Sequence, residues 1–137
     1  MPTAVSERPR NYNPVQNSYH ALWAEYHKLD APIPLMNIIR RILEYYFLQL
    51  CGYDGEELTN TVLKRIKEKT EGEEDSRLKY HLAQAMLFYI RRSSTINDGQ
   101  HFVDESIDGA HYKDVFCMIF EVMGQPQHYE MMMRETE

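Results

Sequence analysis

Three charged side chains near the middle of the sequence have the types and the spacing that acid–base chemistry uses. Arg40, Arg41 and Glu44 lie in residues 36–50, MNIIRRILEYYFLQL, where Glu44 follows Arg40 by four residues and Arg41 by three. Side chains at these spacings are neighbours on a helix of 3.6 residues per turn. We therefore expect a cation beside a carboxylate, with Asn37 in the same sector of the helix.

The chemistry that suits this set is the cleavage of RNA without a metal ion. The reaction needs a base for the ribose 2′-hydroxyl, an acid for the leaving 5′-oxygen and a fixed cation beside the phosphorane. Glu44 or a histidine could be the base, a histidine the acid, and Arg40 the cation. His101, in the sequence NDGQH, is the histidine that we expect to complete the site.

The alternative for these residues is a purely structural role. Arg/Glu pairs at helical spacing are mostly exposed ion pairs that contribute about 0.2–0.5 kcal/mol. Two features favour a site. The rest of the helix is too apolar for a surface helix. In addition, the loop that contains His101 is longer than the roughly 2–8 residues that connect helices in a bundle.

Helices must position these side chains, because apolar residues recur at spacings of three and four and strand-like alternation is missing from the sequence. The fold that we predict is a single all-α domain over residues 17–134, a bundle of five or six helices with one long irregular loop over about residues 93–108. Residues 1–16, with three prolines among polar residues, predict a disordered tail or linker.

The helix boundaries follow from capping and turn residues. We expect six helices. The first runs from an N-cap at Asn17 or Ser18 to about Asp30, the second from around Pro34 to Gly52, and the third from an N-cap at Asp54 to Lys69. The others run from Ser76 to about Arg92, from after Gly109 to a C′ residue at Gly124, and over about residues 127–134. In the second helix the apolar face should be buried, and it includes Leu35, Ile39, Ile42, Leu43, Tyr46, Phe47 and Leu50.

Composition excludes several classes of function. The formal charge of −6 argues against a domain that coats nucleic acid by bulk electrostatics. Cys51 and Cys117 have no partners at metal-ligand spacing, and the sequence has no nucleotide-binding loop, so we expect no metal and no cofactor in this chain. No apolar run approaches 18 residues and no signal peptide is evident, which predicts a cytoplasmic protein without a membrane partner.

Four short segments resemble a known family. They are NSYHALW at 17–23, RRILEYYF at 40–47, INDGQH at 96–101 and HYEMM at 128–132. In this order they are similar to the C-terminal region of the ABC-ATPase-linked anticodon nucleases, the wobble-nucleotide-excising tRNases of bacterial antiphage defence. The resemblance covers about residues 17–133.

The resemblance implies a small helical RNase that cuts tRNA in the anticodon loop by 2′-hydroxyl attack. Its proposed active site consists of an Arg, a Glu four residues later and a downstream His, which correspond here to Arg40, Glu44 and His101. Arg41 and Asn37 would orient the phosphate or Glu44. Arg41 could instead take the role of Arg40, and His81 is the alternative for His101, because the spacing between the Glu and the His varies in the family.

The family also implies partners that this sequence does not encode. The nuclease is regulated by an ABC-type ATPase, in cis or in trans, so ATP or GTP would act only through that absent region. A homodimer is a further expectation. The alternative functions are a non-catalytic interaction or dimerisation domain of such an ATPase, with Arg40 and Glu44 as a buried ion pair, and an inactive fragment of one.

Overall fold

The structure, a computed structural model, describes residues 14–91 and 104–136. In chain order the elements are α2 (Pro14–Lys28), α3 (Pro32–Leu43), η2 (Glu44–Leu50), α4 (Gly55–Lys69), α5 (Ser76–Arg91), α6 (Gly109–Val122) and α7 (Pro126–Glu135). The element η2 is a π-helix that continues α3 directly. The described ranges contain helices and no strand, so the prediction of an all-α fold is confirmed.

Local chemistry accounts for several helix ends. The Asp54 carboxylate accepts hydrogen bonds from the backbone N–H groups of Glu56 and Glu57, which satisfies two free donors at the start of α4. Gly124 follows the C-cap of α6 with a φ of +75°, a backbone conformation that favours glycine. The N-cap predicted at Asp54 and the C′ residue predicted at Gly124 are confirmed.

The first helix begins earlier than predicted. Helix α2 begins at Pro14, so residues 14–16 belong to a helix and not to the tail; proline is favoured in a first helical turn, where its missing N–H is not needed. Helix α3 begins at Pro32, close to the start expected around Pro34. Residues 1–13 and 92–103, which include most of the loop predicted over about residues 93–108, lie outside the described ranges.

The second predicted helix changes from an α-helix to a π-helix about halfway along its length. Its α-helical part ends at Leu43, and the π-helix η2 follows. In an α-helix Leu50 would lie two turns beyond Leu43 on the same face, but a π-helical turn closes at the fifth residue and is therefore wider. Leu50 is rotated off the core face and is 58% exposed, so its predicted burial is wrong, whereas Phe47 is fully buried as predicted.

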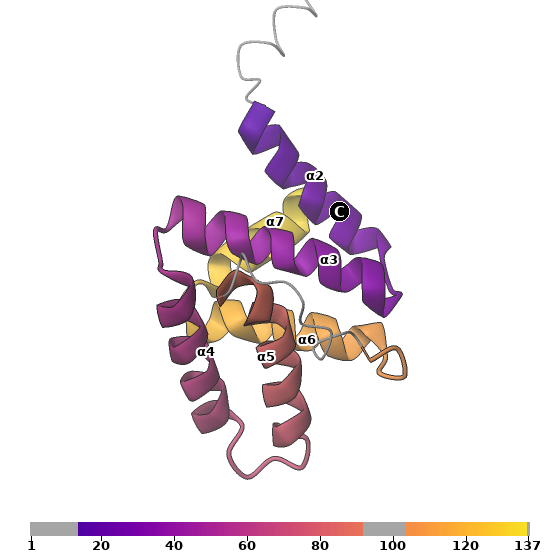
Figure 1. The fold of residues 1–137 in the computed structure, drawn as a ribbon. Coiled ribbons are helices and arrows are strands. Elements are labelled where there is room, and N and C mark those ends of the chain that lie inside the picture. Colours follow the sequence, from indigo (N-terminus) through magenta and orange to yellow (C-terminus); the bar gives the residue numbers. More distant parts are fainter. Residues whose placement is uncertain (1–13, 92–103, 137) are drawn as a thin grey trace, which may run out of the picture.

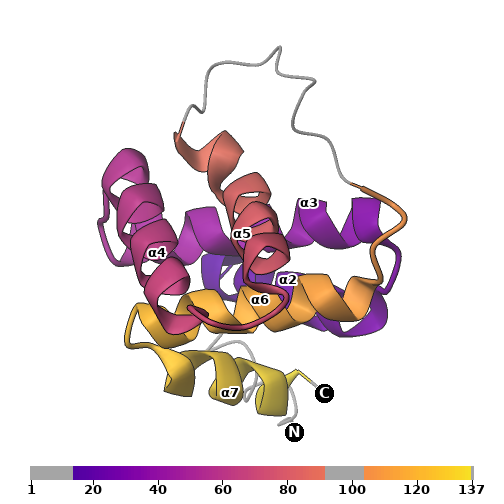
Figure 2. The same cartoon turned by 90° about the horizontal axis from the view of Figure 1, so that it is seen from below.

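The helices pack around one aromatic core. Helices α4 and α5 form an antiparallel pair on one side of the molecule, while α3 runs across their ends (Figure 1). Helix α7 lies along α6 (Figure 2). Trp23 and Tyr26 of α2 pack against Phe116 and Phe120 of α6 and are fully buried. Among the described residues, no helix is both long and apolar enough to cross a membrane.

A backbone contact fixes the start of α6. Gly109 follows the N-cap Asp108, and a Cβ atom at Gly109 would collide with the backbone carbonyl of Asp30, in the turn between α2 and α3. Glycine is thus required there by the close approach of two backbone segments.

Candidate functional site

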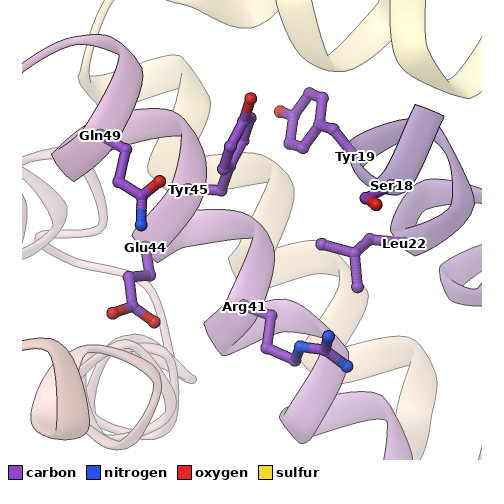
Figure 3. Close-up of a pocket in the computed structure, with 7 residues that line it drawn as sticks. All are labelled: Ser18, Tyr19, Leu22, Arg41, Glu44, Tyr45 and Gln49. Carbon is purple, nitrogen blue, oxygen red and sulfur yellow. The ribbon is translucent and has the colours of Figure 1, made fainter. Parts of the chain in front are cut away.

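A hollow of about 460 Å³ opens between α2 and the junction of α3 with η2 (Figure 3). This size lies in the range of small-molecule sites, about 300–1,000 Å³. The lining side chains come from both sides: Ser18, Tyr19 and Leu22 of α2, and Arg41, Glu44, Tyr45 and Gln49 of α3 and η2.

Arg41 and Glu44 supply the charges of this hollow. Both side chains are exposed, and both line it. Figure 3 shows the guanidinium and the carboxylate extending in different directions, and no ion pair is recorded between these two described residues. Each charged group is therefore presented to the hollow without being neutralised by the other.

Arg40 lies on the other side of the same helix. It is half-buried, and its Nη2 donates a long hydrogen bond of 3.4 Å to the backbone carbonyl of Ala85 in α5. Consecutive residues of an α-helix differ in direction by about 100°, so adjacent arginines can face different neighbours. The structure thus brings Arg41 and Glu44 together at the hollow and directs Arg40 toward α5.

The remaining predicted residues lie apart from the hollow or outside the described ranges. Asn37 is exposed on α3, one turn before Arg41, and does not line the hollow. His81 is exposed on α5; it contributes to lowering the pKa of Asp104, a shift caused mainly by hydrogen bonds from Ser106. His101 lies outside the described residues.

Tyr19 forms a fixed wall of the hollow. Its side chain is only 5% exposed, and a hydrogen bond of 2.7 Å joins its hydroxyl to Nε2 of His128 in α7. The Tyr45 ring rests against the Tyr19 ring, with 4.9 Å between the centroids. Burial raises the pKa of Tyr19 far above its ordinary value, so the hydroxyl keeps its proton.

Behind this wall, Tyr46 and His128 form a second aromatic layer. The two rings are stacked with centroids 4.0 Å apart, and the Tyr46 hydroxyl donates to Oε1 of Gln125 at 2.9 Å. Burial raises the pKa of Tyr46 to about 12 and lowers the pKa of His128. The contacts of His128 in α7 with Tyr19 and Tyr46 therefore fix the position of the tyrosines at the hollow.

Gln49 is a lining residue that the sequence did not suggest. Gln49 follows Glu44 by five residues. In an α-helix this spacing would place the two side chains about 140° apart around the helix axis. Because a π-helical turn closes at the fifth residue, η2 instead brings Gln49 to the side of the helix that carries Glu44. Tyr19 is another lining residue that the sequence did not suggest, because its contact with η2 depends on tertiary packing.

No protein-family model, curated protein or solved structure matches this chain. Within the residues that the structure describes, no group of three or more His, Cys, Asp and Glu side chains is placed to hold a metal ion.

Proposed function

We propose that this chain is a metal-independent endoribonuclease domain of the anticodon-nuclease type, which cuts tRNA in the anticodon loop during antiphage defence. The observation that carries the proposal is that Arg41 and Glu44 line one open hollow beside two tyrosines. A cation and a carboxylate that do not neutralise each other are what phosphate binding and proton transfer require.

In the proposed reaction the ribose 2′-hydroxyl is the nucleophile. Glu44 and His101 share the acid and base roles: one takes the 2′-hydroxyl proton, and the other donates a proton to the 5′-oxygen as the bond from phosphorus to that oxygen breaks. The products are a 2′,3′-cyclic phosphate and a free 5′-hydroxyl. Requiring the 2′-hydroxyl also restricts the substrate to RNA.

The phosphate role passes from Arg40 to Arg41 in this proposal. Arg41 lines the hollow with Glu44, whereas the guanidinium of Arg40 reaches the carbonyl of Ala85. Arg41 would stabilise the charge of the phosphorane, and Arg40 would hold α3 against α5. Asn37, one turn before Arg41, would contact the phosphate of a neighbouring nucleotide.

The test is to incubate the full chain with bulk tRNA in EDTA and to look for discrete fragments with cyclic phosphate ends. Glu44→Gln, Arg41→Ala and His101→Asn should each lower cleavage by about 10²-fold or more, the usual contribution of acid–base and electrostatic groups. A substrate with 2′-deoxyribose at the cut should resist cleavage.

Matched controls come from other helices. Glu68→Gln on α4 and Arg134→Ala on α7 change exposed residues of the same types away from the hollow, and both should cut tRNA like the wild type. His81→Asn separates the two candidate histidines. If His81→Asn abolishes cleavage and His101→Asn does not, the assignment of His101 is wrong.

The rival function is a non-catalytic interaction domain of an ABC-type ATPase. In that case Glu44 and Arg40 would form a buried ion pair, but Glu44 is exposed at the hollow. Size-exclusion chromatography tests the rival directly. A wild-type chain that forms a dimer or binds an ABC-type ATPase and leaves tRNA intact would replace the nuclease proposal.

A further inference from the structure

One end of the hollow is uncharged, and the proposed cleavage reaction does not use it. This end contains the rings of Tyr19 and Tyr45, with Ser18 on one side of them and Gln49 on the other. We infer that it binds one unpaired nucleobase of single-stranded RNA, next to the phosphate held by Arg41. The inference rests on the proposed function for the identity of the ligand as RNA.

Tyr45 and Tyr19 form an aromatic platform in the hollow. Tyr45 is half-buried and lines the hollow, and its ring rests on Tyr19, which is itself fixed by the hydrogen bond to His128. A tyrosine held in this way loses little conformational freedom when a ligand binds. Stacking on aromatic side chains is the usual means by which proteins hold unpaired bases.

Two polar side chains, Gln49 and Ser18, lie on opposite sides of the tyrosine platform. The exposed Gln49 amide offers both donors and an acceptor, and the exposed Ser18 hydroxyl can do either. Such groups can read the hydrogen-bonding edge of a base. Gln49 reaches this side of the helix because η2 is a π-helix, and π-helical turns are frequent at functional sites.

The aromatic platform and the arginine lie at different ends of the hollow. Figure 3 shows Tyr19 and Tyr45 toward one end of the hollow and Arg41 toward the other, while Glu44 lies below Gln49 at the side of the hollow. A nucleotide has the same division, with an uncharged planar base and an anionic phosphate. The hollow thus has an aromatic end for a base and a cationic end for a phosphate.

The experiment uses the full chain and single-stranded 2′-O-methyl RNA of anticodon-loop sequence, in which the nucleophile is blocked. Affinity is measured by fluorescence anisotropy, and stacking by the quenching of 2-aminopurine placed at successive positions. Tyr45→Leu should weaken binding about 5- to 100-fold and abolish the quenching. Tyr45→Phe, which keeps the ring, should preserve both.

Gln49→Ala provides a test that does not depend on core packing, because Gln49 is exposed. It should retain the quenching but reduce the preference for one base over the others. Tyr80→Leu, which changes a half-buried tyrosine of α5, is the control and should bind like the wild type. If Tyr45→Leu loses its helical circular dichroism signal, the variant is unfolded and its affinity cannot test the site. The base preference of Gln49→Ala then tests the nucleobase site instead.

Binding and cleavage give separate results. Glu44→Gln should still bind the 2′-O-methyl RNA and quench 2-aminopurine while failing to cut tRNA. The first possible outcome is that the wild type cuts tRNA, while Gln49→Ala keeps the wild-type base preference and Tyr45→Leu keeps the wild-type affinity. In that case the proposed nucleobase site is wrong, and the proposed nuclease activity is supported. The second possible outcome is that RNA binding depends on Tyr45 but the wild type does not cut tRNA. In that case the nucleobase site is supported, and the proposed nuclease activity is wrong.

Discussion

At the scale of single residues, the two adjacent arginines have different environments. Arg40 is half-buried and donates to the carbonyl of Ala85, whereas Arg41 is exposed and lines the hollow with Glu44. The sequence RR does not distinguish them, because the direction of each depends on which helices pack on either side of α3. Stability and activity should therefore respond to different arginines.

Arg40→Ala should lower the free energy of unfolding by about 1 kcal/mol, the usual contribution of one hydrogen bond. Arg41→Ala, at an exposed position, should change it by less than about 0.5 kcal/mol yet lose tRNA cleavage. Urea denaturation and the cleavage assay measure the two effects. Lost cleavage in Arg40→Ala with unchanged stability would return the phosphate role to Arg40.

His128 should make stability depend on pH. Burial lowers its pKa in the folded protein, so between the ordinary histidine pKa of about 6.5 and the lower folded value the unfolded chain binds more protons. The free energy of unfolding should then fall as the pH drops below about 6.5. The nearby carboxylate of Glu135 raises the pKa of His128 and so opposes the effect of burial. The nearby His20 lowers the pKa of His128 and so adds to it.

The test compares denaturation at successive pH values from 7.5 to 5.0 for the wild type, His128→Gln and the exposed control His111→Gln. His128→Gln should remove part of the pH dependence, and His111→Gln should preserve it. An unchanged slope in His128→Gln would mean that His128 is not the group responsible.

At the scale of elements, the transition from α3 to η2 decides which residues face the hollow and which face the core. Phe47 is fully buried, whereas Leu50, three residues later in the same π-helix, is 58% exposed. Phe47→Ala should cost about 3–5 kcal/mol, the usual loss for a buried aromatic side chain. Leu50→Ser should change stability by less than about 0.5 kcal/mol.

Chemical denaturation of both variants at one temperature tests this contrast. The two changes lie in one element and both remove an apolar side chain, so each is a control for the other. A large loss of stability in Leu50→Ser would indicate that Leu50 packs against something in solution, such as a second copy of the chain.

Gly109 makes the second prediction at this scale. A methyl group there would collide with the carbonyl of Asp30, so Gly109→Ala should force the start of α6 away from the turn between α2 and α3. Overpacking of this kind costs about 1–3 kcal/mol. Thermal unfolding should show a lowered Tm, whereas Ala110→Ser, at the next and exposed position, should leave the Tm within a few degrees.

The sequence predicted the helices better than it predicted the site. Capping residues such as Asp54 and Gly124 act locally, so their effects could be inferred from neighbouring residues. No residue type marks the change from α-helix to π-helix, so Leu50 was assigned to the core and Gln49 was overlooked. The role of Tyr19 depends on α7, which is distant in sequence but supplies His128 as its partner.

At the scale of the whole molecule, the net charge of −6 means that RNA must be attracted by a local site and not by the overall field. A protein that neutralises few phosphates of a single strand loses affinity slowly as salt increases, with a slope of log K against log salt of about −0.7 per phosphate. The hollow contains one arginine, so a shallow slope is expected.

Binding of 2′-O-methyl RNA should therefore show a slope of about −0.7 to −1.4 between 50 and 200 mM salt, corresponding to about one or two phosphates. Arg41→Ala should reduce the slope by about 0.7, whereas Lys64→Ala on the exposed face of α4 should not change it. A slope of about −3 or steeper would require several further basic residues at the RNA-binding surface. It would indicate that RNA binds along the basic face of α4, which carries lysines and Arg65, and not in the hollow.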